Sequence, residues 1–168
     1  MQATAKAKTT TRYYRAMETE RMRELDGSEL ASFQARGTAL LLDFAIAAAL
    51  FLVAGAMAAI GARKMLKLEH IDFELTFFEN WYSIVYLVAF FGLSLYIGNG
   101  KTIGKKLMGI RVVSLVHHRM SLWHSIERAL GYGASTLEFG FGFVQYYIHP
   151  NRRTVHDRMA ETIVVRDR

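Results

Sequence analysis

The sequence has no cysteine and a single proline, Pro150, among its 168 residues. The absence of cysteine excludes structural disulfides, thiolate metal sites and thiol catalysis. Because the only proline lies near the C-terminus, no apolar segment carries a proline kink, and we expect straight helices. Acidic residues are few, with 15 Asp and Glu against 21 Lys and Arg, and the net charge of +6 suits either nucleic acid or an anionic membrane surface.

The longest apolar run, 38–60, contains one charged residue, Asp43. As a helix its 23 residues would extend over roughly 34 Å, enough to cross a hydrocarbon core about 30 Å thick. Because 37 mostly polar residues precede the run, we interpret it as an uncleaved anchor rather than a secretory signal. The chain is therefore predicted to be an integral membrane protein, with the lipid bilayer and not nucleic acid as its partner.

A second apolar segment, 81–97, has 17 residues and carries aromatic residues at both ends, as interfacial anchors do. The loop before it, 62–80, holds three basic and four acidic residues, so we expect it to lie outside. Residues 98–128 hold six Lys or Arg and one acid, which marks the cytoplasmic side. Both termini are accordingly predicted to be cytoplasmic.

The segment 129–148 is long enough to span the membrane, but its four glycines lower its helix propensity and Glu138 would lie near mid-membrane. If it crosses, the basic residues divide 13 to 8 between the cytoplasm and the outside, and if it does not, they divide 18 to 3. The second division fits the positive-inside rule better. We therefore favour a re-entrant or interfacial hairpin, with a third crossing as the alternative.

Two segments rich in β-branched residues, 110–113 and 162–165, have strand character. With a hairpin at 129–148 they would lie on the same side of the membrane, where they could pair. The predicted fold is an all-α integral membrane protein with two firm transmembrane helices, a third membrane-associated helical segment that is re-entrant or spanning, and a small cytoplasmic β pairing.

Several motifs follow one another along this framework. Arg36 stands at the entrance of the first span, Asp43 within it, and Asp157 near the C-terminus. Between and after them come Gly100-Lys101-Thr102-Ile103-Gly104-Lys105-Lys106-Leu107-Met108-Gly109, Arg128, His156-Asp157-Arg158-Met159-Ala160 and Thr162-Ile163-Val164-Val165. In this pattern the chain resembles the RDD family of bacterial membrane proteins, named for one arginine and two aspartates. Glu161 departs from the pattern, since a glycine is more usual there.

The resemblance covers roughly residues 32–165, which leaves 1–31 as a cytoplasmic N-terminal arm and 166–168 as a tail. It implies a multi-pass protein of the bacterial inner membrane. It also implies a link to ligand or ion transport, including sodium–proton exchange for some members.

Arg36 and Asp43 are seven residues apart, so a helix places them on similar azimuths with about 10 Å between them along the axis. A carboxylate in apolar surroundings must be neutral, paired or in contact with water. Asp43 is therefore either a protonatable or cation-binding site, or part of a structural clasp in which a basic residue from elsewhere pairs with it. We favour the clasp, because a proton relay needs more than one polar group along its path.

Asp157 has two interpretations of the same kind. In the first, it bonds the 100–109 backbone or accepts hydrogen bonds from Arg36 or Arg128. In the second, it caps a helix or turn. The residues expected to support a polar cluster of Arg36, Asp43 and Asp157 are Arg128, Glu138 and His156. Glu138 could complete a two-carboxylate cation site with Asp43, although two carboxylates alone do not define a metal site.

Lys101, Lys105 and Lys106 are expected to meet anionic lipid headgroups, each contributing ~1 kcal/mol near the surface. A phosphate-binding loop is excluded, because GxxxxGK[ST] requires glycine where Leu95 stands. No nucleophile and base arrangement and no metal-ligand spacing stands out. We therefore predict no enzyme, no cofactor and no metal site.

For function, the chain has few intramembrane polar groups to line a pathway, and its first span is rich in small residues that allow close helix packing. We favour a non-catalytic accessory or assembly subunit of a larger membrane complex, with a homo-oligomer as the simplest such assembly. The alternative is a component of cation-linked or proton-linked transport that uses the Arg36, Asp43 and Asp157 cluster.

Overall fold

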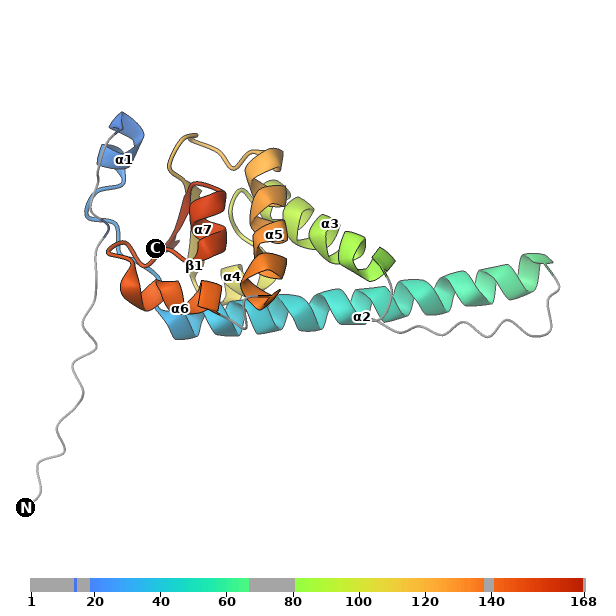
Figure 1. The fold of residues 1–168 in the computed structure, drawn as a ribbon. Helices are drawn as coiled ribbons and strands as arrows, with labels where there is room; N and C mark the ends of the chain where they lie inside the picture. The colour runs from blue at the N-terminus through green and yellow to red at the C-terminus, as the bar shows by residue number, and fades with distance from the viewer. Residues whose placement is uncertain (1–13, 15–18, 67–80, 138–140, 168) are drawn as a thin grey trace, which may run out of the picture.

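A computed structural model of the chain describes residue 14 and residues 19–66, 81–137 and 141–167 (Figure 1). Within these ranges it has seven helices and two strands: α1 (Glu20–Glu24), α2 (Phe33–Leu66), α3 (Trp81–Ile97), α4 (Ile103–Leu107), β1 (Ile110–Ser114), α5 (Leu122–Leu137), α6 (Phe141–Ile148), α7 (Val155–Met159) and β2 (Thr162–Arg166). Most of them gather around the N-terminal half of α2, and the C-terminal half of α2 projects beyond them (Figure 1). We call the gathered elements from α4 to β2 the head and residues 45–66 of α2 the stem.

Helix α2 contains the predicted first span and extends it at both ends. It begins after Ser32, whose Oγ accepts a hydrogen bond of 3.2 Å from the Ala35 amide, and its 34 residues extend over roughly 51 Å. Among the described residues it is the one helix long and apolar enough to cross a membrane, and only 11% of its most apolar window is buried. A core helix of a water-soluble protein would be mostly buried, so this exposure supports a membrane protein.

Helix α3 has the bounds expected for the second span, but its crossing of a bilayer is not shown. Its 17 residues extend over roughly 26 Å, a little short of a hydrocarbon core. It packs against α5, where Gly92 lies so close to Ile126 that an added Cβ would be 3.2 Å from Ile126 Cγ1. The Tyr86 hydroxyl donates a 2.8 Å hydrogen bond to the Ala47 carbonyl and ties α3 to α2.

In the described part of the segment 129–148 the structure has two helices, the end of α5 and the whole of α6, and residues 138–140 lie outside the described residues. Helix α5 begins well before this segment at Leu122, and α6 is a helix of eight residues that packs against α5. The far end of α6 returns to the start of α2, where the ring of Phe33 lies 5.4 Å from that of Tyr146. This arrangement favours the hairpin interpretation. Glu138 lies outside the described residues, so its predicted role is not placed.

The predicted strand pairing is confirmed. Strands β1 and β2 are antiparallel, with Val112 opposite Val164. On its other edge β2 pairs with residues 29–31, which the sequence assigned to the N-terminal arm: Leu30 bridges Val165, and the Ala31 amide donates a 3.0 Å bond to the Val164 carbonyl. Strand β2 thus lies in the middle, and its inward side chains are almost fully buried.

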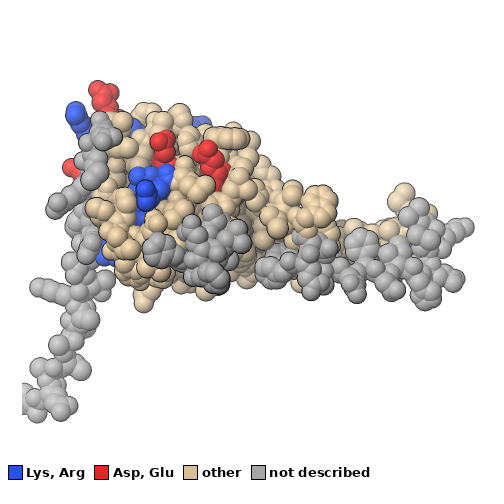
Figure 2. Space-filling view, in the orientation of Figure 1, with Lys and Arg blue, Asp and Glu red and all other residues tan. Residues whose placement is uncertain are grey.

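Charge is distributed unevenly between head and stem. On the face shown in Figure 2, the Lys, Arg, Asp and Glu side chains lie over the head and α1, and the visible described atoms of the projecting stem belong to uncharged residues. Within the apolar run of α2, the one charged residue is Asp43. An apolar stem with a polar head at one end matches a helix inserted in a bilayer below a head at the surface.

Candidate functional site

Asp43 is 1% exposed and is held by the start of α4. The hydroxyl of Thr102 donates to Oδ2, the Gly104 amide donates to Oδ1 at 2.7 Å, and Lys105 Nζ lies 3.5 Å from Oδ2. A carboxylate is favoured at a helix N-terminus, where backbone N–H groups have no partner within the helix. We call Asp43, Thr102, Gly104 and Lys105 the Asp43 clasp.

Two glycines allow the segment around α4 to approach its neighbours closely, Gly104 against α2 and Gly100 against β1. A Cβ at Gly104 would lie 2.3 Å from the Ala39 carbonyl oxygen and 2.9 Å from Asp43 Oδ1, so no other residue fits without a backbone shift. Gly100 has φ +90°, and a Cβ there would lie 2.0 Å from the Val112 carbonyl oxygen. The glycine and lysine segment therefore brings backbone donors to a carboxylate on another helix.

The expected headgroup contact of Lys105 is wrong. Lys105 is 5% exposed and faces Asp43, and its Nζ also lies 3.3 Å from Thr102 Oγ1. Thr102 caps α4 by accepting from the Lys105 amide, which fixes the helix so that position 105 faces α2 and Lys106 faces outward. Lys101 forms an ion pair with Asp167. The headgroup contact of Lys106 stays a prediction.

Asp157 is fully buried on α7 and has both of its expected roles at once. Arg36 Nη1 donates to Oδ2 at 2.9 Å, and Arg128 Nη1 donates to Oδ1. The Thr154 amide donates to Oδ2 at 3.0 Å, which caps the start of α7. We call Asp157, Arg36, Arg128 and Thr154 the Asp157 clasp.

The two arginines of this clasp reach further elements. Arg36 donates to the Arg152 carbonyl at 3.0 Å and to the Val164 carbonyl at 3.2 Å. Arg128 donates to Thr162 Oγ1 at 2.6 Å. The clasp therefore joins α2, α5, α7 and β2, and removing one member of such a buried pair costs about 3–5 kcal/mol.

Burial and charge act in opposite directions on Asp157. Burial alone raises the pKa of its carboxyl, but the attraction of Arg128 and Arg36 outweighs burial and holds the pKa well below its usual range. Asp157 is therefore ionised at every physiological pH. The result is a permanent carboxylate inside the head, neutralised by the two arginines.

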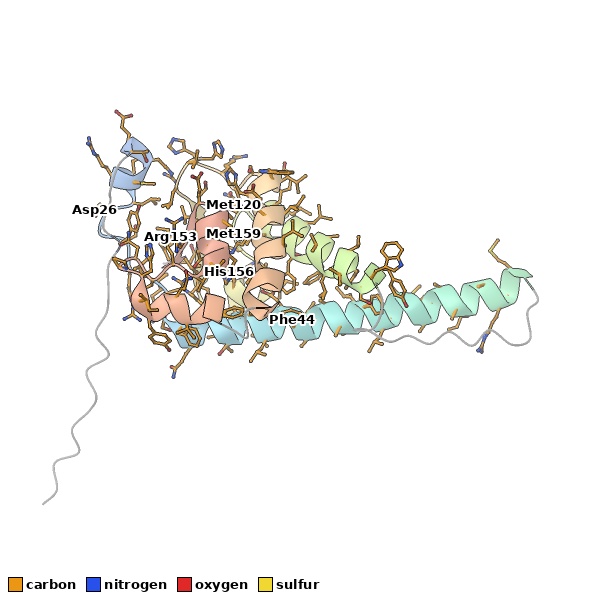
Figure 3. All side chains as sticks on the ribbon, in the orientation of Figure 1. Asp26, Phe44, Met120, Arg153, His156 and Met159 are labelled. Carbon is orange, nitrogen blue, oxygen red and sulfur yellow. The ribbon has the colours of Figure 1, made fainter. Side chains whose placement is uncertain are left out.

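His156 is buried beside Asp157 but is neutral. Burial lowers its pKa to about 3, against the opposing pull of Asp157. Its Nε2 lies 2.8 Å from Thr154 Oγ1, and it packs against α5, where a Cβ at Gly131 would be 2.7 Å from His156 Cβ. Figure 3 labels His156 and Met159 on α7, next to α5.

The expected single cluster of Arg36, Asp43 and Asp157 is divided into two clasps. Arg36 and Asp157 are in contact, and Asp43 has Lys105 as its cation. Among the described residues, no three His, Asp or Glu side chains converge as a metal site would require. Both clasps hold elements together, and each carboxylate has cations and donors from distant parts of the chain.

Sequence reasoning missed two threonines that belong to these clasps, Thr102 and Thr154, and a third, Thr162, that bonds Arg128. Thr102 and Thr154 precede short helices, which is the ordinary position of a capping threonine, and Thr154 has an acid three residues later. These signals could have been recognised. Thr162, the third, carries no such signal, because its contact with Arg128 depends on the fold of the whole head.

Comparison with known proteins supports the resemblance seen in the sequence. The family model of the RDD family matches residues 30–161, a range that contains both clasps and every element of the head except β2. No curated protein and no solved structure matches the chain. Because the matched range covers well over half of the sequence, the chain belongs to the RDD family.

Proposed function

We propose that this chain is a non-catalytic accessory or assembly subunit of a larger membrane complex. The observation that carries the proposal is that Asp43 and Asp157 are both engaged by donors and cations of the same chain. A carboxylate used in this way fixes packing. The clasps give the protein a rigid head attached to an apolar stem.

The stem supports an assembly role because, beyond the contacts of Ala47 and Phe51 with α3, much of its surface is left exposed by the other described residues. Large apolar side chains of its outer face are highly exposed, with Val53 at 57%, Met57 at 68% and Ile60 at 66%. The small residues Ala49 and Ala56 are about two turns apart, lie on the same side of the helix as Val53 and Ile60, and are also exposed. Small residues let a second helix approach closely in lipid.

We also propose two crossings, by α2 and α3, with both termini on the cytoplasmic side of a bacterial inner membrane. Support for the second crossing comes from the aromatic residues at both ends of α3, whose 17 residues suit a slightly thinned bilayer. Support for the orientation comes from the basic residues of the head, because cytoplasmic segments carry an excess of Lys and Arg. The family resemblance supports the choice of membrane.

The test is the mass of the assembly extracted from native membranes in lipid nanodiscs, measured by native mass spectrometry. We expect a complex heavier than the 19.1 kDa chain, either an oligomer or one with a partner in fixed ratio. Ala49→Leu and Ala56→Leu should dissociate it, and Met57→Leu, which leaves a large apolar side chain at an exposed position of the stem, is the matched control. A lone chain in the nanodiscs, with all variants alike, would remove the assembly role.

The second candidate, a transport component, is favoured by one observation: Asp43 is a buried carboxylate in an otherwise apolar part of α2. Sodium and proton flux into liposomes that contain the purified protein tests it against the variant Asp43→Asn. Flux that disappears in the variant supports transport. If the unaltered protein gives no flux, or if the flux survives the substitution, a transport role for Asp43 is excluded and the assembly role is favoured.

A further inference from the structure

A cavity of about 60 Å³ lies where the two clasps meet. Its wall is mainly apolar, with Leu40, Phe143 and Val164 among the lining residues, and the cationic residues Arg36, Lys105 and Arg128 also line it. On this measure a water molecule requires roughly 10–15 Å³. The cavity therefore has room for a small ion with a few waters, but not for a lipid headgroup.

The charges around this cavity do not balance. Its three cationic residues are opposed by two carboxylates, Asp43 and Asp157, each already bonded within its clasp. His156, which also lines the cavity, is neutral. One positive charge is left over among side chains that are almost fully buried, such as Arg128 at 2% and Lys105 at 5% exposed.

Unused hydrogen-bond donors accompany the surplus charge. The Nε atoms of Arg36 and Arg128 are buried and have no hydrogen-bond partner among the described residues. A buried charge without a counter-charge destabilises the folded state more than a buried donor without a partner does. A ligand that brings one negative charge would relieve the charge penalty.

We propose that this cavity binds a small monovalent inorganic anion of the halide or nitrate class. One negative charge matches the single surplus cation, whereas a divalent anion would reverse the imbalance. The apolar part of the wall gives no replacement for lost hydration, so weakly hydrated anions such as bromide and nitrate bind better than fluoride or sulfate. The bound anion joins the Asp43 clasp to the Asp157 clasp, because Lys105 belongs to one and both arginines to the other.

The proposal is tested by thermal unfolding of the full chain in nanodiscs at constant ionic strength. Gluconate, an anion too large for the cavity, is replaced stepwise by chloride, bromide or nitrate. We expect a saturable rise in Tm of about 3–6 °C at ten times the dissociation constant, and none with fluoride or sulfate. Equal Tm values in gluconate and in all smaller anions would overturn the proposal.

Lys105→Gln and Lys106→Gln form a matched pair for this test. Each removes one positive charge from α4, but only Lys105 lines the cavity, and Lys106 is exposed. In Lys105→Gln the carboxylate of Asp43 keeps the Thr102 and Gly104 donors. The anion response should disappear in Lys105→Gln and persist in Lys106→Gln, and the same response in both would mean that the anion binds elsewhere.

A direct measurement on the unaltered protein keeps the proposal falsifiable if Lys105→Gln fails to fold. Exchange of chloride into a buried site broadens the ³⁵Cl NMR line, and nitrate in excess should remove that broadening. Broadening that nitrate does not displace, or no broadening at protein concentrations that saturate the Tm response, would refute an anion in the cavity.

Discussion

Asp157→Asn is the most direct test of the Asp157 clasp. The substitution keeps the shape of the side chain but removes the charge that neutralises Arg36 and Arg128, and it turns an amide NH₂ toward one of these donors. Since Asp157 is fully buried and Arg128 is 2% exposed, water does not replace the lost partner. Uncompensated buried charges of this kind cost about 3–5 kcal/mol, a large part of the 5–15 kcal/mol that holds a typical domain together.

Asp167→Asn is the matched control for this prediction. Asp167 also contacts two cations, Lys101 and Arg111 at 3.4 Å, but its side chain is 25% exposed. Such a partly exposed pair contributes about 0–1 kcal/mol. For a chain of this length, the Tm should therefore fall by roughly 6–20 °C in Asp157→Asn and by no more than about 4 °C in Asp167→Asn.

The measurement is thermal unfolding of both variants in nanodiscs, followed by near-ultraviolet circular dichroism, which reports the packing of the head. The two variants are compared with each other, so any general effect of replacing Asp by Asn cancels. Equal losses of stability in both variants would show that Asp157 has no special role, and the reasoning about a buried, doubly paired carboxylate would be refuted.

Three further predictions concern the same region. His156 has a pKa of about 3 in the folded protein against an ordinary value of 6.5, so the folded state is fully stable with respect to this group above pH 6.5. As the pH drops from 6.5 to 3, the free energy of unfolding should fall by about 1 kcal/mol per pH unit, because the unfolded chain takes up a proton that the folded protein does not. The dependence of Tm on pH should therefore become weaker in His156→Gln but not in His118→Gln, since His118 is exposed. Gly104→Ala should cost about 1–3 kcal/mol by overpacking, whereas Gly133→Ala, with nothing within 4 Å of its added Cβ, should be neutral or stabilising, as denaturant titration would reveal. Asp43→Asn should cost about 1–3 kcal/mol, because Asn loses the attraction to Lys105 but still accepts from the Gly104 amide, and a loss near zero in the same titration would contradict the Asp43 clasp.

The elements that could be predicted from the sequence are those that depend on local pattern. Length and apolarity predicted the helix over 38–60 and the bounds of α3, and β-branched residues predicted the strands over 110–113 and 162–165. The bounds of α5 and α6 were harder to place. The glycines of 129–148 lower helix propensity without saying where a helix ends, so only the preference for a hairpin could be stated.

The partners of the acids could be predicted in kind but not in detail. An acid in an apolar run requires a cation or donors, which follows from desolvation alone. The identity of several of those donors depends on contacts between residues far apart in the sequence, such as Asp43 with Thr102 at 59 positions and Arg36 with Asp157 at 121. Lys105 and Lys106 have the same residue type and adjacent positions, and only the phase of α4, set by the Thr102 cap, decides which of them is buried.

The position of β2 has a consequence for how the chain matures during synthesis. Residues 162–166 come after every other described element, yet they lie in the middle of the pairing, between β1 and residues 29–31. A translating ribosome therefore releases α2 and its anchor to the insertion machinery long before the head can close. A nascent chain interrupted ahead of Asp157 would display Arg36 and Arg128 without their counter-charge, a difference by which quality control could tell unfinished copies from finished ones.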